Sequence, residues 1–260
     1  MARILAIANQ KGGVGKTTTG VNLAASLAAA KRRVLLIDLD PQGNATVASG
    51  IDKRELALSV YDVLLGAAPI SAVRRSCDSG RYDIVPANRE LAGAEVEIVA
   101  LPGRETRLQS ALGEIVQEYD FIFIDCPPAL NLLTVNGLTA AQAVMIPMQC
   151  EYYALEGLSD LVQTIRKVRA NLNPVLEIEG LLRTMYDPRN MLAQQVSQQL
   201  LAHFGDKVYR TVIPRNIRLA EAPSHGLAAL HFDKQSKGAL AYLTLAGEIL
   251  EKSAAKAAAV

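Results

Sequence analysis

The chain has 260 residues, half of them apolar, and its formal net charge is +1 at pH 7. This length and apolar content suit one large α/β domain with a sizeable core, so we expect a single domain over residues 1–260. A charge balance this close to neutral excludes a protein whose whole surface coats nucleic acid, although it allows a local basic patch.

Residues 9–19, NQKGGVGKTTT, form a glycine-rich stretch between an apolar run at residues 2–8 and an Ala/Leu-rich run at residues 16–30. The first run indicates a buried strand and the second a helix. The stretch contains Gly-Lys-Thr, the end of the phosphate-loop pattern G-x-x-x-x-G-K-S/T. Glycines let successive N–H groups point at one anion, and the helix N-terminus adds partial positive charge. Because the loop and its flanks agree, we prefer this interpretation to a purely structural turn.

This loop is therefore predicted to bind the phosphates of a nucleotide. Lys16 is expected to reach the β- and γ-phosphate oxygens, and the Thr17 hydroxyl is expected to ligate Mg²⁺. The loop residues expected to contact the nucleotide are Lys11, Gly12, Gly13, Val14, Gly15, Lys16, Thr17 and Thr18.

Lys11 is a second lysine, placed at the start of the loop. A lysine at that end cannot easily fold back onto the phosphates of its own subunit. It could reach a nucleotide held by another subunit, or it could be a solvated loop lysine.

A second apolar strand is predicted at residues 33–38, and it runs into the loop DLDPQGN. Carboxylates at the C-terminal end of a strand lie on the ligand-binding edge of an open α/β sheet. We expect Asp40 to orient or deprotonate the attacking water, and Asp38 to support Mg²⁺ through its waters. The alternative is that both carboxylates cap a turn. Pro41 and Gly43 break the strand, and such a loop can change with nucleotide state.

Residues 121–128, FIFIDCPP, form an apolar strand that ends at Asp125. An aspartate in this place accepts hydrogen bonds from Mg²⁺-bound water or from the threonine that ligates Mg²⁺. We therefore assign Asp125 to the metal site together with Thr17 and Asp38. The adjacent Cys126 is expected to be inert core rather than a reactive thiol.

The remaining segments alternate between helix and strand signals, which predicts a mostly parallel, twisted sheet with helices on both faces. The predicted strands are at residues 82–86, 143–148 and 175–183. The predicted helices are two short ones within 58–75 and longer ones at 88–99, 105–117, 131–141, 150–171 and 236–258.

Positive charge gathers in the last third of the chain. Residues 181–240 contain eight Lys and Arg against four Asp and Glu, a surplus of four, although the whole chain is only +1. Such asymmetry indicates an anionic partner, and the alternative is an ordinary solvated surface.

The string KGGVGKTT resembles the deviant Walker A box of the ParA/MinD superfamily of P-loop ATPases, and DLDPQGN resembles the switch I motif of ParA proteins. The first resemblance implies that Lys11 contacts the partner's nucleotide in an ATP-sandwiched dimer. The second assigns the water-activating role to Asp40.

Residues 213–226, IPRNIRLAEAPSHG, resemble the ParA segment that closes over the base, which implies that Pro214 and Asn216 line an adenine pocket. In chromosomal ParA proteins, arginines that match Arg189 and Arg218 contribute to sequence-independent DNA binding. The alternative for each is a local salt bridge: the candidate partners are Asp187 for Arg189, and Glu221 or Glu248 for Arg218.

The resemblance covers essentially the whole chain, which is identified as a member of the ParA/Soj partition ATPases. It implies a P-loop NTPase fold, ATP and Mg²⁺ as cofactors, and an ATP-dependent homodimer. It also implies binding to non-specific double-stranded DNA of the nucleoid, and release by hydrolysis that a ParB-type protein stimulates.

Other functions exist on the same scaffold. A MinD-like regulator of division-site placement would carry a membrane-binding C-terminal helix, whereas this tail, EKSAAKAAAV, offers mostly alanine. An iron protein would need cysteines placed for a cluster, which Cys77, Cys126 and Cys150 do not resemble. A positioning ATPase for a non-DNA cargo also remains an alternative. With no signal peptide and no apolar run of about 18 residues, we expect a cytoplasmic protein without membrane contact.

Overall fold

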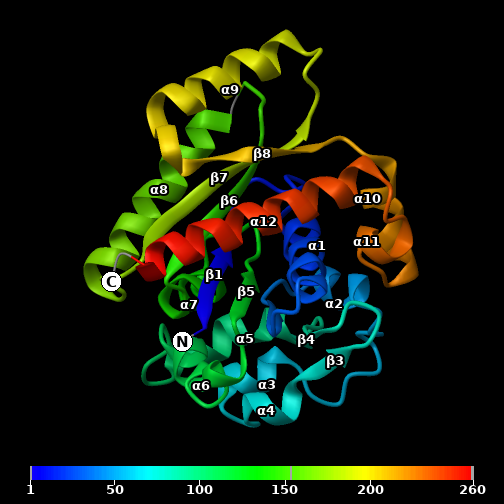
Figure 1. The fold of residues 1–260 in the computed structure, drawn as a ribbon. Coiled ribbons are helices and arrows are strands. Elements are labelled where there is room, and N and C mark those ends of the chain that lie inside the picture. The colour runs from blue at the N-terminus through cyan, green and yellow to red at the C-terminus, as the bar shows by residue number, and fades with distance from the viewer. Residues whose placement is uncertain (1, 153, 259–260) are drawn as a thin grey trace.

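The computed structural model describes residues 2–152 and 154–258, and its centre is one eight-stranded sheet (Figure 1). The strand order is β3-β4-β2-β5-β1-β6-β7-β8, and every neighbouring pair is parallel except β3 and β4. The expected mostly parallel α/β fold is therefore confirmed. The strands are β1 Arg3–Ile7, β2 Val34–Asp38, β3 Arg75–Cys77, β4 Tyr82–Val85, β5 Phe121–Asp125, β6 Ala143–Gln149, β7 Glu177–Tyr186 and β8 Val208–Pro214.

Helices cover both faces of the sheet (Figure 1). The α-helices are α1 Lys16–Ala29, α2 Asn44–Ala48, α3 Val60–Leu65, α4 Ile70–Val73, α5 Leu91–Glu97, α6 Arg107–Leu112, α7 Leu132–Ala140, α8 Ala154–Asn171, α9 Met191–Phe204, α10 Ile217–Glu221, α11 Ala229–Phe232 and α12 Lys237–Ala258. Single turns of 3₁₀ helix are η1 Ile98–Ala100, η2 Val116–Glu118, η3 Gly205–Lys207 and η4 Ala222–His225.

The central strand β1 shows why this sheet is buried on both sides. Its side chains alternate, so Leu5 and Ile7 enter the apolar cluster beneath α1 and α12, whereas Ile4 and Ala6 enter the cluster beneath α7 and α8. A strand with two buried faces is apolar where it is buried, which explains the apolar run at residues 4–7 after Arg3.

The strand register brings the predicted site residues to one edge of the sheet. In β5, Asp125 pairs with Ile7 at the end of β1 on one side and with Asp38 at the end of β2 on the other. The phosphate loop leaves β1 at the same level. The edge therefore gathers the loop and both carboxylates where β1 lies between β5 and β6.

Several element bounds differ from the sequence prediction. The helix expected at residues 88–99 is α5 followed by the turn η1, and the helix expected at 105–117 ends at Leu112, beside Gly113. β7 continues past Arg183 to Tyr186. The start of the helix expected at residues 150–171 includes residue 153, which lies outside the described residues.

Candidate nucleotide-binding site

The glycine loop leads from β1 into α1 and leaves open space where phosphates would lie. Gly13 and Gly15 have φ values of 73° and 88°, a region that residues with a Cβ rarely adopt. A Cβ at Gly12 or Gly13 would meet no atom within 4 Å, so these glycines fill no packing role against neighbours. The loop also departs from the general pattern, because Gln10 stands where that pattern has its first glycine.

Hydrogen bonds to β6 and β7 hold the phosphate loop in place. The Asn9 side chain donates to the carbonyl oxygen of Pro147 in β6 at 2.8 Å and accepts from the Lys11 N–H at 3.0 Å. The Thr184 hydroxyl of β7 donates to the Val14 carbonyl at 2.8 Å. The loop is thus tied to β6 and β7 through its outer atoms, which leaves its other N–H groups for a ligand.

Lys16, the first residue of α1, is almost buried at 7% exposure. Its ammonium donates to the Lys11 carbonyl at 3.1 Å. Burial lowers the pKa of Lys16, and the nearby Asp125 opposes that shift. A buried cation with one neutral acceptor is poised for anionic oxygens, which would compensate its lost hydration.

Thr17 and Asp125 fit a Mg²⁺ ion. The Thr17 hydroxyl donates to Asp125 Oδ2 at 2.7 Å, whereas Asp125 Oδ1 is buried and has no hydrogen-bond partner in the described residues. Burial raises the pKa of Asp125 well above its usual value, and the neighbouring Asp38 adds to the shift. A divalent cation, or water bound to it, would satisfy the unpaired oxygen and stabilise the charged carboxylate.

Asp38 organises the loop that follows β2. Its Oδ2 accepts from the N–H and the hydroxyl of Thr46 at 2.9 and 2.8 Å, and its Oδ1 accepts from the Asp40 N–H at 3.1 Å. Burial raises the pKa of Asp38 to about 6, against the opposing effect of these hydrogen bonds. The contacts seen for Asp38 are therefore those of a loop anchor, and its role toward Mg²⁺ stays a prediction.

Asp40 is partly exposed at the rim of the same site. Its Oδ1 accepts from the Gln42 N–H at 2.9 Å, which closes a small turn. Gly43 follows with φ of 60°, where a Cβ would lie 2.8 Å from the Ala87 carbonyl oxygen. The turn-capping alternative is thus visible in the structure, and water activation by Asp40 stays a prediction.

Lys11 points away from the phosphate loop. Its ammonium forms an exposed ion pair with Glu151, which follows β6. Sequence reasoning did not identify Glu151 as its partner. The contact of Lys11 with a nucleotide of the partner subunit stays a prediction.

A cavity of about 170 Å³ adjoins the loop on the side of β8. Gly15 and Thr18 line one wall, and Pro214 and Asn216 line another. Asn216 Oδ1 is buried and has no partner in the described residues, so an amide acceptor is left available. The structure thus brings the predicted base-contacting residues beside the predicted phosphate loop, although their contact with adenine stays a prediction.

Arg189 lies in the loop after β7 and Arg218 lies in α10, which follows β8; the two strands end beside each other, because Tyr186 of β7 pairs with Pro214 of β8. Arg189 pairs with Asp187, and Arg218 pairs with Glu221.

Arg218 also lies 3.3 Å from Asp233, a pairing we did not expect. Glu248 instead accepts from the N–H groups of Arg210 and Thr211 at 2.9 and 3.0 Å. The local salt bridges therefore exist, and both arginines remain exposed.

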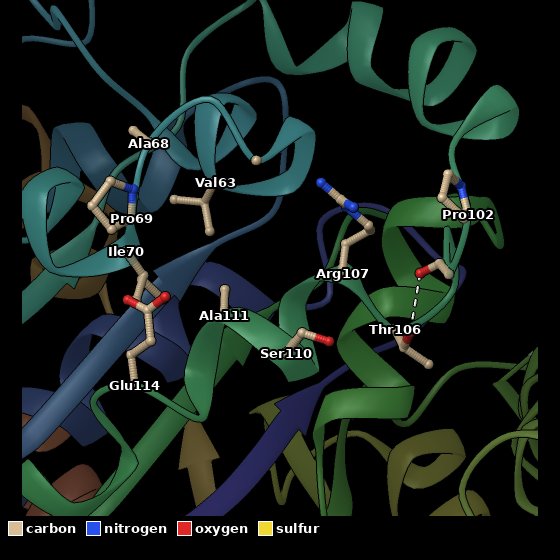
Figure 2. A pocket seen from close by; sticks show the side chains of 12 residues that line it. Val63, Ala68, Pro69, Ile70, Pro102, Thr106, Arg107, Ser110, Ala111 and Glu114 are labelled. Carbon is tan, nitrogen blue, oxygen red and sulfur yellow. Dashed lines mark hydrogen bonds between the residues drawn. The ribbon is translucent and has the colours of Figure 1, made fainter.

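A larger cavity, of about 460 Å³, lies between α3, α4 and α6 and shares no lining residue with the phosphate loop (Figure 2). Arg107 enters it and donates through Nε to the Leu64 carbonyl at 2.7 Å, at the end of α3. This contact caps α3, and the cavity belongs to a different part of the fold from the candidate site.

A family model described as an AAA domain matches residues 2–178. The chain is 54% identical to the sporulation initiation inhibitor protein Soj of Bacillus subtilis, over 96% of this chain and 98% of that protein. It is 51% identical to the chromosome partitioning protein ParA of Caulobacter vibrioides, over 96% and 94% of the two chains.

Solved structures show the same fold. A cobyrinic acid a,c-diamide synthase from Mycobacterium smegmatis with bound ADP and magnesium has a TM-score of 0.85 and 41% identity, over 96% of this chain and 94% of that chain. MinD of Pyrococcus horikoshii, complexed with Mg-ADP, has a TM-score of 0.78 and 26% identity, over 96% of both chains. The chain therefore belongs to the ParA/Soj family of chromosome-partitioning P-loop ATPases, within the wider family that includes MinD.

Proposed function

We propose that this ATPase binds ATP with Mg²⁺, dimerises around the nucleotide, binds DNA without regard to sequence and leaves DNA after hydrolysis. The observation that carries the proposal is the convergence of Lys16, the Thr17–Asp125 pair and the Asp40 loop at one sheet edge. Structural neighbours with bound ADP or an ATP analogue and magnesium support the choice of cofactors.

The chemistry is mostly positioning and charge stabilisation. The loop N–H groups and Lys16 hold the phosphates, Thr17 and Asp125 hold Mg²⁺, and Asp40 orients the water that attacks the γ-phosphate. Bound Mg²⁺ would offset negative charge on the phosphates. Asp38 accepts hydrogen bonds from the Asp40 N–H and from the Thr46 hydroxyl, and so links the two ends of the loop at residues 40–44. A phosphate contact at Asp40 would therefore change the position of this loop.

The dimer requires Lys11 to leave Glu151 and reach the partner's nucleotide. The ion pair is half exposed, at 47% and 50% for the two side chains, and such pairs are weak enough to exchange. Replacing Lys11 with alanine should leave ATP binding intact and abolish ATP-dependent dimerisation and hydrolysis.

Size-exclusion chromatography with a slowly hydrolysed ATP analogue, beside a nucleotide-binding titration, measures both properties of Lys11→Ala. An Arg32→Ala variant, which also removes an exposed cation, should behave as wild type. Wild-type dimerisation of Lys11→Ala would contradict the cross-subunit role.

DNA binding is assigned to an arginine patch made of Arg189 and Arg218. Contacts to phosphates carry no sequence information, so binding should be indifferent to sequence and should weaken steeply with salt. ATP-dependent dimerisation would double the patch and so roughly double the slope of log affinity against log salt. The surplus of four positive charges in residues 181–240 supports this location.

Replacing Arg189 or Arg218 with glutamate should abolish DNA binding and leave ATP-dependent dimerisation unchanged. A DNA mobility assay and size-exclusion chromatography test the two halves. Wild-type DNA affinity in both variants would refute the patch, and loss of dimerisation would mean that the arginines are structural.

The remaining parts of the cycle follow from the family. We assign release from DNA to hydrolysis that a ParB-type partition protein stimulates, and we place the ATP-bound dimer on the nucleoid. The names of the Soj and ParA relatives support a role in chromosome partitioning. DNA binding measured with ATP, with ADP and without nucleotide, beside the oligomeric state, is the most direct test.

A MinD-like function is the second candidate, because a MinD structure shares the fold. Among the described residues, no helix is long and apolar enough to cross a membrane. Binding to anionic lipid vesicles rather than to DNA in the presence of ATP would favour this candidate. A positioning ATPase for a non-DNA cargo would bind neither lipid vesicles nor a ParB-type partition protein.

A further inference from the structure

Both arginines of the patch are paired with nearby carboxylates: Asp187 in the same loop as Arg189, and Glu221 of α10 and Asp233 after α11 for Arg218. Arg189 donates through Nε and Nη2 to the two oxygens of Asp187 at 3.0 and 2.8 Å, a fork-to-fork pair. Arg218 donates through Nη1 to Glu221 at 2.7 Å, and its Nε lies 3.3 Å from Asp233. Three carboxylates are therefore in direct contact with the two cations that are assigned to DNA.

Each pair still presents a free donor to solvent. The side chains of Arg189 and Arg218 are 88% and 49% exposed. Nη1 of Arg189 and Nη2 of Arg218 take no part in these pairs, so each guanidinium can approach a phosphate while it keeps its carboxylate. The carboxylate would then lie close to the phosphate and repel it, or the pair would have to open.

We propose that Asp187, Glu221 and Asp233 are antagonists of DNA binding that hold the affinity of one protomer too low for stable attachment. This inference rests on the proposed DNA-binding function of the arginine patch. Its functional consequence is reversibility: the affinity of the dimer stays low enough that loss of dimerisation is sufficient for release. At Asp187 the antagonism acts throughout the neutral range, because hydrogen bonds from Arg189 lower the pKa of this carboxyl to about 2.

Amide substitutions test the proposal without removing the local turns. Asp187 Oδ1 also accepts from the Arg189 N–H at 2.9 Å, and Asp233 Oδ1 accepts from the Gln235 N–H at 3.2 Å. An amide oxygen can keep both hydrogen bonds, so Asp187→Asn and Asp233→Asn remove charge and leave the turn acceptor. Glu221→Gln does the same for the third carboxylate.

The Asp52–Arg54 pair has the same hydrogen-bond geometry as the Asp187–Arg189 pair and provides a control. Asp52 Oδ1 accepts from the Arg54 N–H and Nε at 2.9 and 3.2 Å, and Oδ2 accepts from Nη2 at 3.4 Å. Asp52→Asn therefore opens an equivalent pair outside the patch. Asp206→Asn removes one exposed negative charge from residues 181–240, the segment that also contains the patch. Among the described residues, Asp206 has no arginine partner.

The measurement is the affinity of a random-sequence DNA duplex for the dimer with a slowly hydrolysed ATP analogue, at several salt concentrations. Exposed ion pairs of this kind correspond to about 1.5- to 5-fold in an equilibrium constant. Opening one pair in both protomers should raise DNA affinity roughly 2- to 25-fold, with the largest gain at low salt. Asp52→Asn and Asp206→Asn should stay near the wild-type value.

The outcomes separate this inference from the function on which it rests. If Arg189→Glu and Arg218→Glu keep wild-type DNA affinity, the patch itself is wrong. If they lose DNA binding but Asp187→Asn, Glu221→Gln and Asp233→Asn bind as wild type does, the antagonism is refuted. Equal gains in Asp206→Asn would also overturn it, because net charge alone would then account for the effect. Unchanged dimerisation and melting temperature establish that each variant is folded.

Discussion

Replacing Asp40 with alanine is expected to reduce ATP hydrolysis by about 10² to 10⁴ while ATP binding and dimerisation persist. Asp40 lies at the rim of the site, and its Oδ1 accepts a hydrogen bond from the Gln42 N–H. Lys16 and Thr17 make their hydrogen bonds with the Lys11 carbonyl and Asp125, and the contact of Asp40 with Asp38 uses the Asp40 backbone N–H, which alanine keeps. The variant should therefore form the ATP dimer and remain on DNA, because the hydrolysis that ends the DNA-bound state is slow.

Asp40→Asn separates water activation from loop geometry. Its amide oxygen can still accept from the Gln42 N–H, but it is a poor base, so the variant should hydrolyse ATP as slowly as Asp40→Ala. Phosphate release in single-turnover conditions measures the chemical step, and Asp52→Asn serves as a control at a neighbouring exposed carboxylate. Normal hydrolysis in Asp40→Asn with slow hydrolysis in Asp40→Ala would assign Asp40 a structural role in its loop.

The sequence predicted the site well where the determinants are local or follow from strand direction. The phosphate loop is a local strand–loop–helix pattern, and Gly13 and Gly15 adopt the conformations that only glycine readily supplies. Asp38 and Asp125 end parallel strands, and the register places them opposite each other. Both predictions needed only the rule that parallel strands present their C-terminal ends at one edge.

Contacts between distant segments were not predictable in this way. Lys11 pairs with Glu151, and Thr46 connects Asp38 to the Ala87 N–H at 2.9 Å. Neither partner lies in a motif, and a sequence does not reveal which exposed carboxylate a lysine will meet. The salt bridges Arg189–Asp187 and Arg218–Glu221 were foreseen as alternatives because the partners are two or three residues apart, whereas the Arg218–Asp233 pair was not.

Several elements of the described chain escaped prediction, among them β3, β8, α9 and the short helices α2, α10 and α11. β3 is only three residues long, and β8 was interpreted as part of a motif rather than as a strand. α9 lacks charged residues of the Asp, Glu, Lys and Arg types, so its polar face consists of glutamines and was not recognised as a helix face. Its start did carry a signal, because the Asn190 side chain caps it by accepting from the N–H groups of Leu192 and Ala193.

Replacing Lys16 with alanine is expected to abolish ATP binding at cellular nucleotide concentrations. The ammonium is nearly buried, and the structure provides it with one carbonyl acceptor at 3.1 Å. Removing one member of a buried, hydrogen-bonded charge pair costs about 2–5 kcal/mol, or roughly 30- to several-thousand-fold in affinity. Lys16→Gln, which keeps most of the side-chain length without the charge, should lose affinity as well.

Loss of ATP binding should occur without loss of the fold. Burial lowers the pKa of Lys16 in the folded protein, so the unfolded chain holds this proton more tightly. The protonated lysine therefore disfavours folding at neutral pH, and removing it should leave the nucleotide-free melting temperature equal or higher. A titration with a fluorescent ATP analogue and a thermal melt measure the two properties, with Lys11→Ala as the variant that keeps ATP affinity. If Lys16→Ala and Lys16→Gln bind ATP as wild type does, residues 9–19 are not the phosphate site, and the assignment of Thr17 and Asp125 to Mg²⁺ fails with it.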